Sequence, residues 1–346
     1  MKRKFLRVAA LLTVCTMLVC CFAACANTKN KKTVATVGEY EIPYEQLRFV
    51  TMTYKAELEA LYGDGNAENG TIWDDAATAE KYRAELEELV WDNIRYNYAI
   101  LQVCANRNIG KEIFEGKEIA ATVDEQIDAL IAEYASKKDY KKDLEARYAT
   151  EDLFRFYFAL DEMKYLLRAS MQKDGMFLSD EKEFEEWLLA ANSAYVQHFL
   201  LYHESDEEKE ENYIILENAR LRLISGELTL DQCINLANDD LYNVAPYYLV
   251  RNLHNDALVN AAVKLDVNEV SQIVEVDGAL YVIVRMEETP IVGANGTTET
   301  PLSLKLTQLL SDYQWAIVGD AVEATKTNIV LELNDYGKSI DLVTME

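Results

Sequence analysis

The feature that most constrains the fold of this chain is a change in hydrophobic period near Ala194. Between residues 44 and 191 apolar residues recur at spacings of three and four, as in Leu47, Val50 and Leu58, which is typical of amphipathic helices. From Ala194 onward, short apolar runs such as YVQHFLLY alternate with shorter helical stretches. The order strand, helix, helix, helix, strand, strand up to residue 288 predicts a compact α+β domain.

Local signals mark several boundaries of the expected elements. Asp74 or Asp75 is expected to cap the second long helix, because aspartate accepts hydrogen bonds from helix N-termini. Thr122 and Thr229 are each followed three residues later by Glu or Gln, the pattern of a capping box. Tyrosine and phenylalanine are frequent at helical spacing before residue 191, and we expect them to form a core.

The C-terminal part contains two predicted hairpins. Asp277-Gly278 separates two strand-like stretches and is a strong signal for a tight turn. Residues 240–252, DLYNVAPYYLVRN, are expected to be irregular. The segments NIVLEL and SIDLVT near the C-terminus resemble a hairpin that needs a partner strand, and Val34–Ile42 is the candidate. That pairing would make the compact α+β domain an insertion in a discontinuous, mostly helical domain.

The N-terminus has the pattern of a targeting signal. Four basic residues precede residue 8, and the run from Val8 to Ala24 carries no charge. A spanning helix needs about 20 apolar residues, so this shorter run favours a signal peptide. It ends in FAAC, which resembles a bacterial lipobox with Cys25 as the lipidated residue, although Cys20 and Cys21 stand close by. We therefore expect a lipid anchor in the bacterial cell membrane and a chain on its extracytoplasmic face.

Charge and cysteine content exclude several classes of function. The chain has 34 basic and 60 acidic residues, a formal net charge of −26. Such a surface repels nucleic acid, so no nucleic-acid partner is expected. Cys104 and Cys233 lie in helical patterns without basic neighbours, which favours buried structural thiols over reactive ones.

Residues 194–288 resemble the parvulin family of peptidyl-prolyl isomerase domains. The similarity is carried by RLISGELTLDQCINLANDD and by LVNAAVKLDVNEVSQIVEVDGALYVIVRME. The layout of the whole chain resembles the extracytoplasmic PrsA and SurA foldases. The resemblance implies a signal peptide (1–24), a tether (25–32), a helical chaperone segment (33–191), a parvulin-like domain (192–289) and a C-terminal helix and hairpin (290–346) that complete the chaperone domain.

The resemblance also assigns site residues. His198 falls at the family's first-strand histidine and Asp240 at its acidic position, whereas Tyr281 replaces the second histidine. His254 and Leu258 replace a methionine and a phenylalanine of the proline pocket. A prolyl isomerase must stabilise a twisted amide against a barrier of about 18–20 kcal/mol. These replacements therefore predict weak or no isomerase activity, with His198 as a core histidine hydrogen-bonded to Tyr281.

His203 lies five residues after His198 and has no counterpart in the family. Side chains alternate along a strand, so the two histidines are expected on opposite faces, with His203 at a solvated strand end. Two ligands on opposite faces cannot reach one ion, and neither a metal nor another cofactor is expected.

The sequence suggests three functions. The favoured one is a membrane-anchored chaperone or foldase that binds unfolded or nascent secreted polypeptides. An active isomerase using His198, Asp240 and Tyr281 is the alternative. A solute-binding lipoprotein of a transporter is more remote, because its two similar lobes of alternating strands and helices are missing between residues 44 and 191. A homodimer is left open by the sequence.

Overall fold

The computed structural model describes residues 32–38, 40–63, 71–74, 78–110, 113–114, 117–240, 245–292 and 298–345. The signal peptide, Cys25 and nearly all of the tether lie outside these ranges. The described chain divides into two units, which we call the helical unit (residues 32–174 and 318–345) and the sheet unit (residues 175–317). Each is described by itself.

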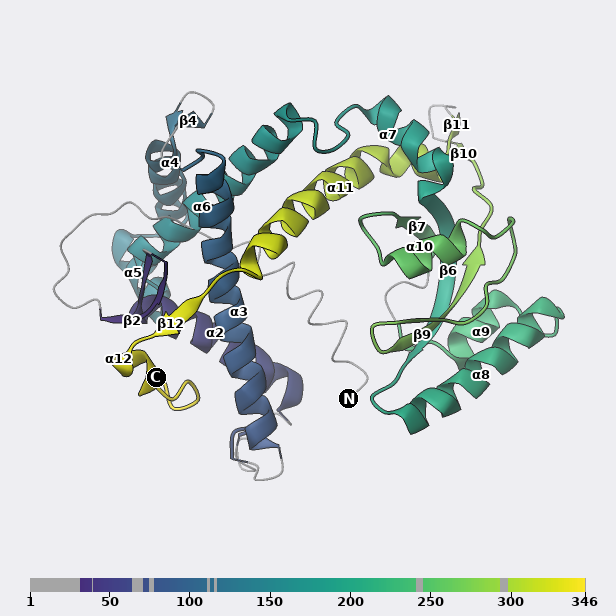
Figure 1. The fold of residues 1–346 in the computed structure, drawn as a ribbon, viewed down its shortest axis with the longest axis horizontal. Coiled ribbons are helices and arrows are strands. Elements are labelled where there is room, and N and C mark those ends of the chain that lie inside the picture. The colour runs from purple at the N-terminus through teal and green to yellow at the C-terminus, as the bar shows by residue number, and fades with distance from the viewer. Residues whose placement is uncertain are drawn as a thin grey trace. The chain divides into compact units, whose positions relative to one another are not determined.

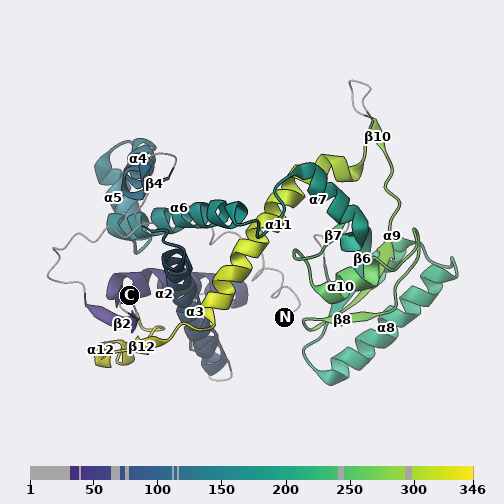
Figure 2. The ribbon, with the colours of Figure 1, turned by 45° about the horizontal axis from the view of Figure 1, so that its top comes forward.

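The helical unit is built from long helices and a small sheet. Helix α3 packs against α2 and α6, and α4 packs against α6 (Figure 2). The expected aromatic core is confirmed, since Tyr98, Tyr140 and Phe156 are fully buried. The elements are β2 (Thr33–Val37), β3 (Tyr40–Pro43), α2 (Tyr44–Tyr62), α3 (Ala79–Asn106), β4 (Ile113–Phe114), β5 (Lys117–Glu118), α4 (Ile119–Ala132), α5 (Lys137–Ala146), α6 (Glu151–Lys173), the end of α11 (Pro301–Lys326), β12 (Leu331–Leu333) and α12 (Asp335–Lys338) (Figure 1).

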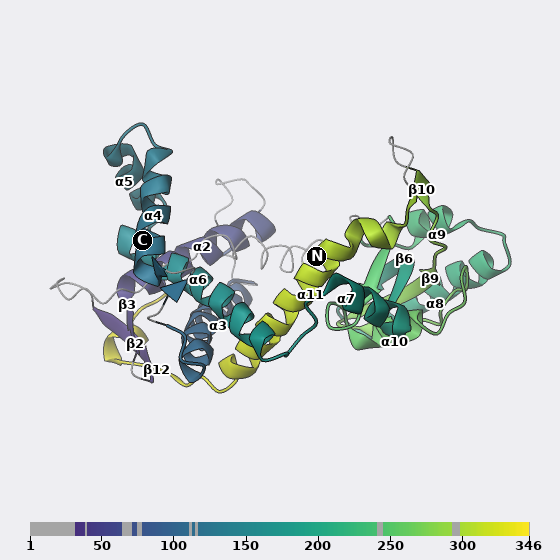
Figure 3. The same ribbon diagram turned by 90° about the horizontal axis from the view of Figure 1, so that it is seen from above.

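The two ends of the described chain meet in a three-stranded sheet of order β12-β2-β3 (Figure 3). Strand β12 pairs antiparallel with β2, with Leu331 opposite Val37 and Leu333 opposite Ala35. The predicted return of the C-terminal strand to Val34–Ile42 is therefore confirmed. The second strand of that C-terminal hairpin was a wrong prediction, because helix α12 and a bent segment follow β12 instead.

The sheet unit is an antiparallel sheet of order β7-β6-β9-β8 with helices on both faces (Figure 1). Helix α10 packs against all four strands, and α8 packs against β6 and β9. The elements are α7 (Glu181–Trp187), η2 (Leu188–Asn192), β6 (Ser193–Tyr202), α8 (Asp206–Ile224), α9 (Leu230–Leu236), β7 (Tyr247–Val250), α10 (Asp256–Ala262), β8 (Val274–Val276), β9 (Ala279–Arg285), β10 (Ile291–Val292), β11 (Thr298–Glu299) and the start of α11.

Strand β6 has two buried faces because side chains alternate along it. On the α10 face, Ala194 and Val196 pack with Val259 and Ile283. On the other face, Phe199 and Leu201 pack with Leu216 of α8, Cys233 of α9 and Leu280 of β9. The sequence shows a nearly continuous apolar run here, rather than strict alternation, because both faces are covered. Cys104 and Cys233 are buried free thiols, as expected.

The local turn and cap signals had mixed outcomes. Asp277 and Gly278 both have positive φ, 49° and 73°, and close the β8–β9 hairpin as predicted. Thr229 and Gln232 form the predicted capping box at α9.

Two cap predictions and one loop prediction were wrong. Thr122 lies inside α4, which already begins at Ile119. Helix α3 begins at Ala79, whereas the Asp74 carboxylate accepts hydrogen bonds from Thr71; the alternative cap, Asp75, lies outside the described residues. Part of the segment expected to be irregular forms strand β7. The α+β class is confirmed. Within the described ranges, no helix combines the length and the apolar character needed to cross a membrane.

Candidate functional site

The candidate site is a polar cluster on the α10 face of the sheet. Strand β6 brings His198 to this face, two residues beyond Val196, and leaves its side chain only 3% exposed. Strand β7 lies beside β6 with Val196 opposite Tyr247. Strand β9 lies on the other side of β6. It places Ile283 opposite His198, and Tyr281 comes two residues before Ile283 on the same strand. The cluster therefore draws on three neighbouring strands.

His198 is hydrogen-bonded through one ring nitrogen. The hydroxyl of Tyr247 lies 2.9 Å from Nδ1, and the two rings meet edge to face at 83°. The expected hydrogen bond from Tyr281 was a wrong prediction, because Tyr281 makes only a ring contact with His198, with centroids 5.7 Å apart. Tyr247 was missed because it lies in the segment expected to be irregular. The four residues of that strand show no polar–apolar alternation.

The second ring nitrogen of His198 faces a buried carboxylate. Nε2 lies 3.3 Å from Oδ2 of Asp240, whose side chain is 4% exposed. The contact lacks hydrogen-bond geometry, and Nε2 has no hydrogen-bond partner. His198 and Asp240, which the resemblance assigned to one site, are therefore in contact.

Burial controls the protonation of the phenols around His198. Burial raises the pKa of Tyr247 well above its ordinary value, and the nearby charges of Tyr281 and Asp240 raise it further. Burial and Asp240 also raise the pKa of Tyr281. Because burial keeps the Tyr247 phenol protonated, its hydroxyl can donate to Nδ1 of His198 in the ring tautomer that carries its proton on Nε2, beside Asp240.

His254 is bound to the main chain at the end of β7. The Val250 N–H donates to His254 Nδ1 at 3.1 Å. Burial lowers the pKa of His254 below its ordinary value, which favours this neutral, accepting form. Its ring also contacts Tyr247, with centroids 5.9 Å apart. Leu258 is buried in the core beneath the sheet with Val259.

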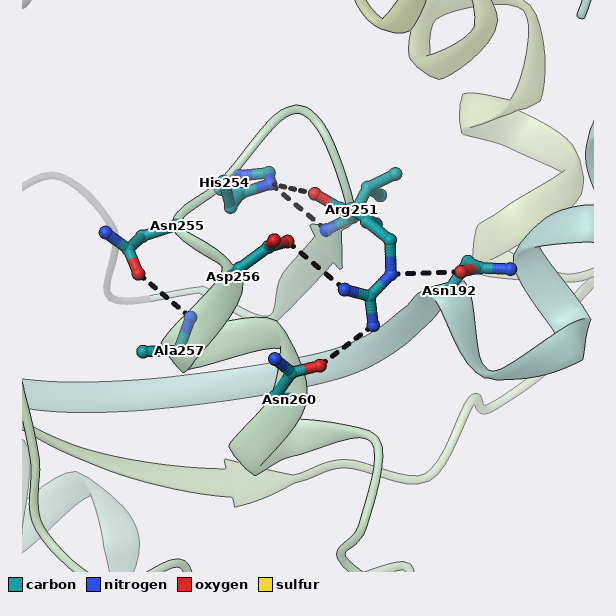
Figure 4. Close-up of polar contacts among 8 residues, drawn as sticks. Asn192, Arg251, His254, Asn255, Asp256, Ala257 and Asn260 are labelled. Carbon is teal, nitrogen blue, oxygen red and sulfur yellow. Dashed lines mark hydrogen bonds and ion pairs between the residues drawn. The ribbon is translucent and has the colours of Figure 1, made fainter.

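Arg251, close to His254, links the end of strand β7 to the residue before β6 and to helix α10 (Figure 4). Its guanidinium donates to Asn192 at 3.0 Å, to Asp256 at 3.2 Å and to Asn260 at 2.9 Å. Asn255 caps α10 by accepting from the Ala257 N–H. These contacts fix the turn that carries His254 against the start of α10.

His203 does not belong to this cluster. It follows the end of β6, and its Nε2 lies 3.7 Å from Glu275, which also pairs with Lys209. The prediction of a solvated side chain was wrong, since the His203 side chain is only 13% exposed. Among the described residues there is no group of three His, Cys, Asp or Glu side chains that could hold a metal ion.

Comparison with known proteins gives matches among solved structures. No family model matches the chain, and no curated protein does. A peptidylprolyl isomerase, PrsA, from Bacillus anthracis matches with 13% identity and a TM-score of 0.40, over 69% of this chain and 97% of that one. The foldase PrsA of Streptococcus pneumoniae matches with 13% identity and a TM-score of 0.30, over 82% and 97%.

A third match comes from work on two SurA-like chaperones of Campylobacter jejuni, PEB4 and Cj1289. It has 12% identity and a TM-score of 0.26, over 88% of this chain and 99% of that one. Each of these three solved structures comes from a PrsA foldase or from work on SurA-like chaperones.

Proposed function

We propose that this protein is an extracytoplasmic chaperone that binds unfolded polypeptides, and that its parvulin-like domain has weak or no prolyl isomerase activity. One observation carries the proposal: ring nitrogens of the candidate site are hydrogen-bonded to other groups of the protein and are not directed at a substrate. His198 Nδ1 is bound by Tyr247, and His254 Nδ1 is bound by the main chain of Val250.

A prolyl isomerase lowers a barrier of about 18–20 kcal/mol by stabilising the twisted amide more strongly than the planar one. That requires polar groups directed at the substrate and an apolar recess for the proline ring. In this chain one ring nitrogen of His198 is bound by Tyr247, one of His254 is bound by the main chain, and Leu258 is buried in the core. The arrangement favours a fold used for binding over one used for turnover.

The chaperone role is supported by the exposed apolar surface of both units. Tyr165 and Val330 of the helical unit and Ile214 and Val292 of the sheet unit have half or more of their surface in contact with solvent. Exposed apolar groups are the features that an unfolded client can bind. The pairing of β12 with β2 supports one discontinuous chaperone domain with residues 192–289 inserted.

Activity as an isomerase is the second candidate, and the buried His198–Asp240 pair favours it. Buried titratable pairs of this kind cluster at functional sites. A protease-coupled proline isomerisation assay, run beside suppression of aggregation of an unfolded substrate, separates the two functions. We expect suppression without turnover. Turnover that His198→Ala abolishes and His203→Ala preserves would establish the isomerase instead. Absence of both activities would contradict both candidates.

The membrane anchor is a separate part of the proposal and rests on the FAAC sequence. Incorporation of labelled palmitate into the protein in bacterial cells tests it. We expect Cys25→Ser to abolish incorporation, with Cys20→Ser and Cys21→Ser as matched controls that leave it intact. Loss of label in either control would move the anchor to that cysteine.

A further inference from the structure

Helix α8 is apolar on the side that faces solvent. Its inner side packs on the sheet through Leu216 and Ala219. Its outer side carries four large apolar side chains, each about half exposed or more: Tyr213, Ile214, Leu221 and Ile224. Their spacing places them on one side of the helix, because residues separated by about three, four or seven positions share a face. We call these four residues the outer face of α8.

This pattern departs from that of a helix that only covers a sheet. Such a helix buries one apolar stripe and presents charged or polar residues opposite to it. Single exposed apolar residues are normal on protein surfaces. Four of them lie along one side of one helix, with Glu217 between the first two and the last two, and such a grouping of exposed apolar side chains marks an interaction site.

The charges around the outer face are mostly negative. All three basic side chains of α8 already form ion pairs, Lys209 with Glu275, Arg220 with Glu217 and Arg222 with Glu227. The helix carries further carboxylates in its first two turns: Asp206, Glu207, Glu208, Glu210 and Glu211. A partner that covers the apolar side chains thus meets an excess of negative charge.

This negative charge determines which kind of partner can bind the outer face. A second copy would bring two acidic helices together in a chain of net charge −26, and like charges at an interface oppose association. Anionic lipid surfaces are disfavoured for the same reason. A polypeptide with both apolar and basic residues satisfies both features of the surface.

We propose that the outer face of α8 binds unfolded polypeptide segments in which apolar residues alternate with basic ones. The inference rests on the proposed chaperone function. It adds which kind of unfolded segment this one surface binds. From Tyr213 to Ile224 the helix rises about 16 Å, which matches about five residues of extended chain. A short stretch of client therefore spans the site.

The test compares two double variants of the whole protein. Ile214→Gln with Leu221→Gln removes two side chains of the outer face, which are 69% and 52% exposed. The matched control, Leu189→Gln with Leu304→Gln, removes side chains that are 69% and 50% exposed elsewhere. The probe is a fluorescent peptide of about twelve residues, enough to span the site, in which leucine and phenylalanine alternate with lysine and glycine. A second peptide has glutamate in place of lysine.

We expect the basic peptide to bind the wild-type protein and the control, with about tenfold or greater loss of affinity in the outer-face variant. The acidic peptide is expected to bind much more weakly, and added salt to weaken the basic peptide's binding. Equal affinity of both variants for the basic peptide would overturn the inference. So would sedimentation of the wild-type protein as a dimer that the outer-face variant dissociates.

Aggregation suppression separates this inference from the proposed function. If the wild-type protein and the outer-face variant suppress aggregation equally, with unchanged peptide affinity, the chaperone function stands and the outer face is not its client site. If the wild-type protein neither suppresses aggregation nor binds the peptide, the proposed function fails and the inference fails with it.

Discussion

Replacing Tyr247 by phenylalanine removes one hydroxyl from the centre of the candidate site and leaves the ring in place. That hydroxyl bonds Nδ1 of His198 at 2.9 Å. Because the His198 side chain is 3% exposed, water cannot replace the lost partner. A buried polar atom left without a partner costs about 1–3 kcal/mol. We expect Tyr247→Phe to lower the free energy of unfolding of the sheet unit by this amount.

Urea unfolding followed by the ring proton signals of the histidines measures the effect. The chain has three histidines, and His198 and His254 both report on the sheet unit. With a urea dependence of about 1–3 kcal/mol per molar, the midpoint should fall by roughly 1 M.

The control is Tyr213→Phe, which removes the hydroxyl of a half-exposed tyrosine in the same unit and should change stability by less than about 0.5 kcal/mol. A double-mutant cycle with His198→Phe completes the test. Since removing both partners leaves neither end of this hydrogen bond unpaired, the double variant should lose less stability than the two single variants together. An unchanged midpoint in Tyr247→Phe, or simple additivity in the cycle, would refute the reasoning.

Three further predictions follow from single contacts. Gly337→Ala should weaken the pairing of β12 with β2, because an added Cβ would lie 2.0 Å from the Val34 carbonyl oxygen. Hydrogen exchange of the β2 amides should become faster in this variant, and an unchanged exchange rate would contradict the prediction. Burial raises the pKa of Cys104 to about 12 and that of Cys233 above its ordinary value. Maleimide labelling, located by peptide mass, should therefore leave both thiols unmodified until urea unfolds the protein. Burial lowers the pKa of His254 in the folded state below its ordinary value of 6.5, so the unfolded chain binds this proton more tightly. The free energy of unfolding should therefore fall as pH drops through that value, and should fall less in His254→Gln; an equal fall in both proteins would exclude this origin.

Several features of the fold were predictable because a few neighbouring residues determine them. The hairpin at Asp277-Gly278 needs only two residues that tolerate positive φ. The cap at Thr229 and Gln232 lies within one helical turn. The same pattern at Thr122 failed, because the preceding residues from Ile119 had already entered the helix. A local motif thus predicts a boundary only when its neighbours do not extend the element.

The candidate site was predictable in part. The sequence resemblance placed His198 and Asp240 together, and they are 3.3 Å apart. It paired His198 with Tyr281, whereas Tyr247 supplies the hydrogen bond. The four residues of strand β7, YYLV, have no polar–apolar alternation that would mark them as a strand in the sequence.

Composition and periodicity along the chain were enough to predict the helices of residues 44–191, the α+β order after Ala194 and the acidic charge. Which side chains meet depends on how elements that are distant in sequence pack against one another. The contact of Tyr247 with His198 requires β7 beside β6 in one register. The sequence predicted that the C-terminal strand returns to Val34–Ile42, but not the register that sets Leu331 opposite Val37, almost 300 positions away. Such pairings depend on the packing of distant elements, so neither is encoded in the residues that precede and follow each strand.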